Sequence, residues 1–156
     1  MSDTNWLDAD EARAWRGLQF MQMRLESELA RQLAADSTLS LQDYTVLVAL
    51  TDHDDQRLRP YELAAAIGWD KTRLSHHLKR MIDRDLVRKE SCPSDRRGFF
   101  IAVTDRGRKA IEDAAPAHVD SVRSFFIDLL SRDELAVIAQ VTERVLANFS
   151  DPTPDC

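Results

Sequence analysis

The sequence is poor in residues that interrupt helices and in residues that cross-link small secreted domains. Its 156 residues include four glycines, five prolines and two cysteines. So little glycine and proline argues against a loop-rich β-sandwich or a low-complexity chain, and it favours long helices. Cys92 and Cys156 cannot build a disulfide framework, and no spacing of cysteine and histidine matches a zinc site. The length suits one domain around a single core.

Long hydrophobic runs are also missing. The longest uncharged stretches, 44–51 and 135–142, have eight residues each, whereas a membrane-spanning helix needs about 20 apolar residues. The first dozen residues carry four acidic side chains and no basic one, the opposite of a targeting segment. We therefore expect a cytoplasmic protein with no membrane partner.

Signatures of catalysis are absent as well. The sequence has no glycine-rich phosphate loop, no metal signature, and no cysteine or serine paired with an identifiable histidine and acid. His76 and His77 are adjacent, so on a helix they point about 100° apart and do not form a ligand pair. The sequence predicts no enzyme, no catalytic residue, no cofactor and no metal site.

Charge is present but unevenly distributed. The net charge is -6, yet residues 57–109 hold 14 Arg and Lys against 7 Asp and Glu, a balance of +7. Residues 1–56 carry a balance of -7 and residues 110–156 a balance of -6. Because a local basic patch, not the overall charge, attracts phosphate backbones, the middle of the chain is the candidate functional face.

Apolar residues at steps of three and four predict two helices in the first third of the chain. Asp8 followed by Glu11 forms a capping box that opens a long amphipathic helix over 8–33. Ser40 with Asp43 opens a second, almost wholly apolar helix that ends near residue 52. This second helix should lie in the core.

Two shorter helices should follow. Pro60 suits a first helical position, and Gly68 suits a left-handed stop. Asp70 caps the next helix, at about 71–84, whose apolar stripe would face the core. Two helices joined by a tight glycine turn are typical of a helix-turn-helix.

The rest of the chain reads as a hairpin and two more helices. Segments 86–90 and 99–104 are rich in β-branched and aromatic residues and flank a turn-forming, eight-residue loop at 91–98 with a basic tip. Thr104 caps a long helix that reaches residue 130, and Pro116 favours a bend in it. Ser131 with Glu134 opens the last helix. Residues 151–156 should form a disordered tail.

The helix at 71–84 would present a polar face away from the core. Arginine can bind guanine O6 and N7, and serine and threonine reach bases or phosphates, so this face suits a DNA major groove. The predicted contacts on it are Thr72, Arg73, Ser75, His76, Lys79 and Arg80. Arg96 and Arg97 at the loop tip could enter the adjacent minor groove. The alternatives are a solvated helix face and a charged tip that protects the hairpin edge.

The hairpin tip and the strand leaving it form a motif. The chain has Asp95-Arg96-Arg97, then the hydrophobic segment 99–102, Val103-Thr104 and Gly107. This motif resembles that of the MarR family of winged-helix transcriptional regulators, which is Asp, any residue, Arg, a short hydrophobic strand, Leu-Thr, two residues and Gly, with Val103 here in place of leucine. Upstream, Asp85 stands where the family usually has glycine. The resemblance spans nearly the whole chain.

The resemblance implies a mainly α (α+β) fold, a winged helix-turn-helix with long N- and C-terminal dimerisation helices. Residues 1–156 would then be one domain, with a DNA-binding lobe at 40–104 and dimerisation helices at 1–36 and 105–150. It further implies a homodimer that represses transcription from a pseudo-palindromic duplex DNA operator and is released by a small, often aromatic and anionic effector.

The effector site and two alternatives complete the expectations. The resemblance implies an effector pocket between the dimerisation helices and the DNA-binding lobe, where an arginine could pair with a carboxylate. The candidate ligand contacts are therefore Trp15, Arg16 and Tyr44. Core packing is the competing explanation for Trp15 and Tyr44. The alternative functions are a winged-helix module that binds only protein, and a redox-responsive regulator in which basic neighbours lower the pKa of Cys92.

Overall fold

The long first helix forms as its capping box predicts. In the computed structural model, which describes residues 4–149, α1 spans Ala9–Asp36. The Asp8 carboxylate accepts hydrogen bonds from the backbone N–H groups of Asp10 and Glu11, and the Glu11 side chain accepts one from the N–H of Asp8. Only the end of this helix enters the core, because Leu33 is its one buried residue.

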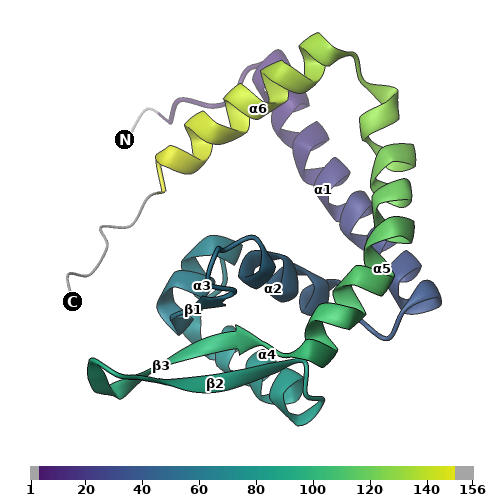
Figure 1. The fold of residues 1–156 in the computed structure, drawn as a ribbon. Helices are drawn as coiled ribbons and strands as arrows, with labels where there is room; N and C mark the ends of the chain where they lie inside the picture. The colour runs from purple at the N-terminus through teal and green to yellow at the C-terminus, as the bar shows by residue number, and fades with distance from the viewer. Residues whose placement is uncertain (1–3, 150–156) are drawn as a thin grey trace.

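A lobe of three helices and a small sheet follows α1 (Figure 1). Its elements are α2 (Leu41–Thr51), β1 (Arg57–Leu58), α3 (Pro60–Ile67), α4 (Lys71–Asp83), β2 (Val87–Cys92) and β3 (Asp95–Val103). Ser40 and Asp70 cap α2 and α4, as predicted. Gly68 ends α3 in the left-handed conformation, with φ of 67°, so the tight turn of the helix-turn-helix is confirmed.

The sheet is larger than the sequence pattern indicates. Its strand order is β1-β3-β2, all antiparallel, and β1 was not predicted. The eight-residue loop expected at 91–98 is wrong, because strand pairing continues until Cys92 stands opposite Asp95. The serines, proline and glycine of this segment are typical of turns, but only Pro93 and Ser94 lie between the strands.

The C-terminal part is helical, with one break. Thr104 caps α5 (Asp105–Phe125), which continues through Pro116. The helix predicted to reach residue 130 instead ends at Phe125 and is followed by the 3-10 turn η1 (Ile127–Leu129). Ser131 and Glu134 form the predicted capping box of α6 (Arg132–Ala147). The tail predicted at 151–156 lies outside the described residues.

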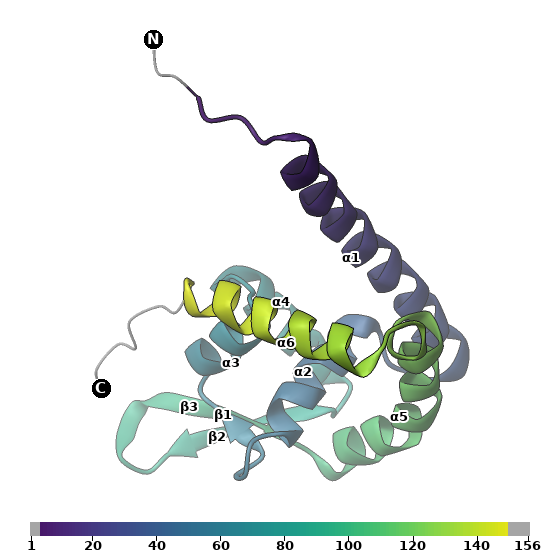
Figure 2. The same cartoon turned by 90° about the horizontal axis from the view of Figure 1, so that it is seen from above.

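The core sits in the lobe and under the first half of α5. Leu47, Leu50 and Leu63 of the lobe are fully buried, and Ile111 of α5 packs onto this cluster. The first half of α1 extends away from the lobe, whereas α6 runs back above it (Figures 1 and 2), and neither contributes a buried residue. Within residues 4–149, no helix is long and apolar enough to cross a membrane.

The turn between α4 and β2 forms without the glycine that the family motif favours. Asp85 adopts the left-handed conformation itself, with φ of 58°. Its carbonyl accepts a hydrogen bond from the Thr104 hydroxyl at 2.5 Å, which holds the turn against the start of α5. Gly107 is required there, because a Cβ at this position would clash with the carbonyl of Leu86.

Candidate nucleic-acid interface

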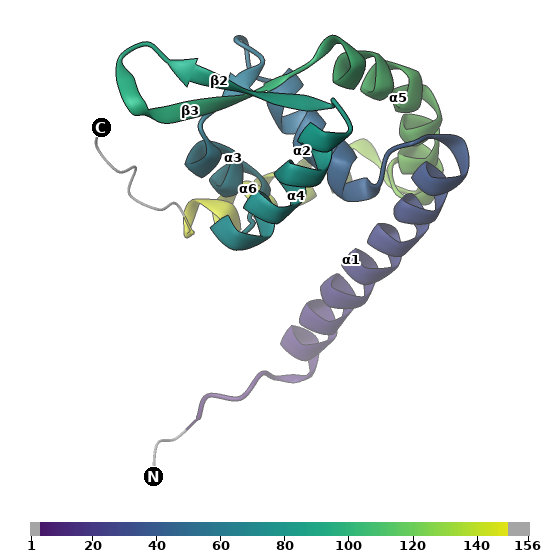
Figure 3. The same cartoon turned by 90° about the horizontal axis from the view of Figure 1, so that it is seen from below.

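The outer face of α4 carries the polar residues that its periodicity predicts. Leu74, Leu78 and Met81 are buried on the inner side of the helix. The predicted contacts are all exposed: Thr72, Arg73, Ser75, His76, Lys79 and Arg80. Viewed from below, α4 and the β2–β3 hairpin lie on the same side of the lobe (Figure 3). The exposed basic residues of both elements therefore belong to the same side of the lobe.

Arg59, which directly follows β1, holds the tip of the β2–β3 hairpin. Sequence reasoning did not single out this residue. The guanidinium of Arg59 lies 3.6 Å from the Asp95 carboxylate and 4.7 Å from the ring centre of Phe100. Asp95 also accepts a hydrogen bond from the backbone N–H of Arg97 at 3.0 Å. A Cβ on Gly98 would clash with Arg59. Asp95 therefore braces the turn, and the side chains of Arg96 and Arg97 are exposed.

A groove of about 1110 Å³ separates α4 from the hairpin. Apolar side chains line part of it, among them Leu74, Leu78 and Phe99. Cations from both elements also line it, including Lys71, Lys79 and Arg97. A concave, partly apolar surface with basic residues from two elements suits a polyanionic partner whose backbone passes over it.

Two arginines on α4 are held by neighbouring side chains. The guanidinium of Arg73 stacks over the ring of Trp69, 4.1 Å from its centre. Arg80 donates a hydrogen bond to Nδ1 of His77 at 3.1 Å. His77 is buried and meets Trp69 edge-on, with ring centres 5.4 Å apart. Sequence reasoning considered His77 only as a metal ligand beside His76, rejected that pair, and gave His77 no other role.

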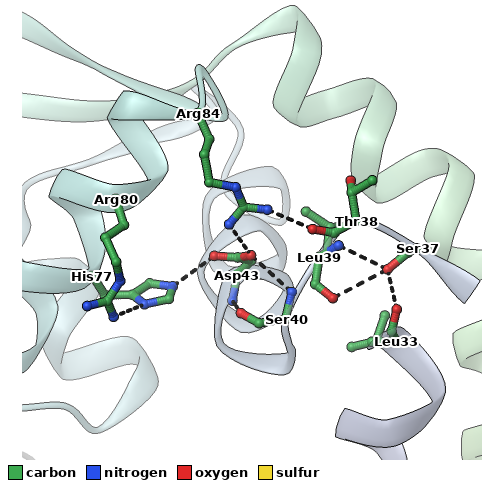
Figure 4. A network of polar contacts seen from close by, with 9 residues as sticks. All are labelled: Leu33, Ser37, Thr38, Leu39, Ser40, Asp43, His77, Arg80 and Arg84. Atoms are coloured by element: carbon green, nitrogen blue, oxygen red, sulfur yellow. Dashed lines mark hydrogen bonds and ion pairs between the residues drawn. The ribbon is translucent and has the colours of Figure 1, made fainter. Parts of the chain in front are cut away.

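Asp43 connects this part of α4 to α2 (Figure 4). It is 1% exposed, and its carboxylate binds the guanidinium of Arg84 at 2.6 Å and the backbone N–H of Ser40 at 3.0 Å. Its second oxygen lies 3.0 Å from Nε2 of His77. Burial alone would raise the pKa of Asp43, but the contacts with His77, Ser40 and Arg84 outweigh it and hold the pKa far below its usual range.

Sequence reasoning assigned Asp43 only a capping role, which the structure confirms. Its partners Arg84 and His77 come from α4 and the end of that helix, far along the chain, so no local spacing could reveal them. The one available signal was an acidic residue inside an otherwise apolar helix, because a buried carboxylate requires polar partners.

The candidate effector contacts do not meet within one chain. Tyr44 packs against the ring of His118 at 4.2 Å, and His118 donates a hydrogen bond to Gln32 near the end of α1. Burial lowers the pKa of His118. Arg16 stands 16 residues before Gln32 in the same helix, about 24 Å away at 1.5 Å per residue. Trp15 is 54% exposed, so packing within the chain does not account for it.

Cys92 lies at the base of the hairpin tip. Its sulfur accepts a hydrogen bond from Arg59 at 3.0 Å and lies 3.2 Å from the Ser94 hydroxyl. The hydrogen bonds with Ser94 and, after them, the charge of Arg59 lower the pKa of the Cys92 thiol. They outweigh the burial of this residue, which by itself would raise the pKa. Among residues 4–149, no cluster of three or more His, Cys, Asp or Glu side chains could hold a metal ion.

Comparison with known proteins identifies the family. The sequence profile of the MarR family matches residues 37–98, the segment that contains α2, the helix-turn-helix and the hairpin as far as the start of β3. The transcriptional regulator HosA of Escherichia coli O111:H- is 30% identical over 135 residues, which cover 85% of this chain and 98% of HosA. The chain belongs to the MarR family.

Solved structures of MarR family regulators from Streptomyces coelicolor have the same fold. AbsC is 37% identical, with a TM-score of 0.86, over 94% of this chain and 98% of AbsC. Sco3205, whose structure was solved in complex with DNA, is 35% identical, with a TM-score of 0.87, over 98% of this chain and 95% of Sco3205. The winged helix-turn-helix fold predicted from the motifs is confirmed, and the chain is a MarR family transcriptional regulator.

Proposed function

We propose that this MarR family regulator binds duplex DNA as a homodimer, with α4 in the major groove and the hairpin at the minor groove. The observation that carries the proposal is the joint exposure, on one side of the lobe, of the basic residues of α4 and of Arg96 and Arg97. A relative of similar sequence, Sco3205, was solved in complex with DNA. The two α4 helices of a dimer would enter successive major grooves about 34 Å apart on a pseudo-palindromic operator.

The dimer would form through α1 and the C-terminal helices, within the segments 1–36 and 105–150. Large apolar side chains in these segments are exposed in the single chain: Phe20 is 65% exposed, Leu146 67% and Phe149 70%. Exposed apolar surface of this extent favours association, and a second copy presents the same surface in a closed, two-fold arrangement.

We further propose that the protein acts as a repressor released by a small aromatic anion. Tyr44 would contact the ligand from the lobe, while Trp15 and Arg16 would approach from α1 of the second copy, since one chain keeps them far apart. The guanidinium of Arg16 would pair with the carboxylate of the ligand. If phenolic acids leave the DNA affinity of the wild-type protein unchanged, this part of the proposal fails.

The β2–β3 hairpin, which is the wing, and α4, which is the recognition helix, should contribute differently to the affinity for DNA. Arg97→Ala should weaken binding to many sequences alike, because a minor-groove and backbone contact is largely independent of sequence. Arg73→Ala and His76→Ala should each reduce discrimination by about 1–3 kcal/mol at particular positions, as expected for lost base-edge contacts.

The test is a titration of the wild-type protein and these three variants against a selected duplex, its single-base variants and a random duplex. One salt concentration serves all comparisons, and the wild-type protein is also titrated over a salt series, where log affinity should fall steeply with log salt. A winged-helix module that binds only protein would retain none of these duplexes, and that result would overturn the proposal.

A further inference from the structure

One buried imidazole joins an exposed arginine of the recognition helix to a buried carboxylate in α2. His77 is 7% exposed, and its two ring nitrogens face different partners. Nδ1 lies 3.1 Å from a guanidinium nitrogen of Arg80, and Nε2 lies 3.0 Å from Asp43 Oδ1 (Figure 4). Arg80 itself is exposed on the outer face of α4. A fixed buried group therefore touches a side chain that DNA would meet.

The partners determine which nitrogen of His77 carries the proton. A guanidinium has only donors, so Nδ1 must be the unprotonated acceptor and the proton must sit on Nε2, facing the Asp43 carboxylate. That N–H does not point straight at the oxygen, so the contact is electrostatic more than a directed hydrogen bond. Asp43 therefore selects the tautomer that can receive Arg80.

Asp43 is itself held firmly. Arg84 bridges its carboxylate to the carbonyl of Thr38, with distances of 2.6 and 2.7 Å. The N–H of Ser40 binds the same carboxylate oxygen as Arg84. Trp69 meets the imidazole of His77 at an interplanar angle of 88° and restricts the ring further. The orientation of the imidazole is thus set by α2 and by the turn before α4, not by solvent.

We propose that His77 and Asp43 are positioning residues that hold the Arg80 guanidinium in place for DNA before the duplex arrives. The inference rests on the proposed DNA-binding function. A long arginine side chain that is already ordered loses less conformational freedom on binding, and this difference corresponds to about two- to tenfold in Kd. The imidazole contributes a hydrogen-bond acceptor at a fixed place and does not contact DNA.

The test is a double-mutant cycle of the full chain with His77→Ala, Arg80→Ala and the double variant. Each protein is titrated against the duplex that the wild-type protein selects from random sequence, at one salt concentration and without any effector. His77→Ala should weaken binding about two- to tenfold in the wild-type background. It should have almost no further effect once Arg80 is alanine, because its role runs through that side chain.

A conservative variant separates positioning from packing. In His77→Asn the amide oxygen can take the place of Nδ1 and accept from Arg80, so this variant should keep most of the affinity that His77→Ala loses. It also serves if His77→Ala does not fold. His118→Ala is the matched control, because His118 is equally buried, 8% exposed, but lies in α5 and binds Gln32. It should reduce thermal stability and leave the Kd for the duplex unchanged.

Three results would overturn the inference. The first is an equal loss from His77→Ala with and without Arg80, the second is a His77→Asn variant as weak as His77→Ala, and the third is a similar loss of affinity in His118→Ala. If the wild-type protein binds the duplex and any of these results is found, His77 has no positioning role but the proposed DNA-binding function stands. A wild-type protein that binds no duplex overturns the proposed function together with this inference.

Discussion

The lobe, residues 40–104, and the arms, defined as α1 and α6, differ in how far their apolar side chains are buried. The lobe buries or partly buries nearly all of its large apolar residues, and its buried carboxylate, Asp43, is paired with the partly exposed Arg84. The arms expose apolar residues, such as Phe20 and Leu146, among acidic ones. The apolar residues of the lobe are therefore covered within the single chain, in part by Leu33 of α1 and Ile111 of α5, whereas the arms leave apolar surface exposed.

The largest test of this comparison places a charge on an arm. Val145 of α6 is 52% exposed, so Val145→Glu should cost the single chain little but prevent burial of this face in a dimer. The affinity for a duplex with two half-sites should fall by about 100-fold or more, because linked binding of two lobes is lost. Sedimentation velocity should show a monomer.

Gln140→Glu provides the matched control for this arm. Gln140 lies on the side of α6 away from Val145 by helical periodicity, and it is also exposed. The added charge there should leave both the dimer and its affinity for DNA unchanged. If Val145→Glu still sediments as a dimer, α6 does not form the interface and the contrast between lobe and arms loses its explanation.

The next test removes a charge from the lobe. Asp43→Asn should lower the free energy of unfolding by about 2–3 kcal/mol at neutral pH, because it leaves Arg84 and His77 without their carboxylate. Glu28→Gln in α1 should change it by less than about 0.5 kcal/mol, since the ion pair of Glu28 with Arg31 is on the surface. Urea denaturation measures both.

The same Asp43 variant gives a pH dependence with a defined sign. The folded state lowers the pKa of Asp43 from its ordinary 3.8, so the carboxylate stabilises the fold above that pH and its contribution declines as pH falls below it. The difference in unfolding free energy between wild type and Asp43→Asn should therefore narrow in acid. A difference that stays constant or widens there would show that the contacts of Asp43 do not favour its ionised form.

Two glycine substitutions should show the contrast between lobe and arms through smaller changes in stability. Gly107→Ala should destabilise by about 1–3 kcal/mol, because its Cβ would clash with the Leu86 carbonyl where α5 joins the lobe. Gly17→Ala in α1 should stabilise by about 0.5–1 kcal/mol, since nothing lies within 4 Å of the added methyl group and alanine favours a helix. Thermal unfolding of the two variants should shift in opposite directions.

The smallest effect concerns backbone strain. Among the described residues, both non-glycine positions with positive φ, Gln56 and Asp85, belong to the lobe. Asp85→Gly should raise the free energy of unfolding by about 1 kcal/mol or less, because glycine adopts the left-handed conformation without the penalty of a Cβ. Asp83→Gly, at the last position of α4, should lower it by a similar amount. If both substitutions lower the free energy of unfolding equally, the positive φ of Asp85 does not cost stability.

Local sequence predicted the helices well because their ends depend on residues a few positions apart. The capping boxes at Asp8, Ser40 and Ser131 and the left-handed stop at Gly68 all formed where the pattern placed them. The hairpin was less predictable. Turn-forming residue types at 91–98 suggested a loop, whereas pairing with the opposite strand extended both β2 and β3 into it.

Local sequence was enough to predict where each helix begins and which residues face outward on α4, because caps and periodicity act within four residues, but it did not predict the end of α5 at Phe125. The contacts that hold the hairpin tip and Asp43 in place form only in the folded chain. Arg59 reaches Cys92 across 33 positions, and Arg84 reaches Asp43 across 41. Contacts between residues so far apart leave no periodic trace in the chain, since folding alone brings their partners together and burial alone makes those partners necessary.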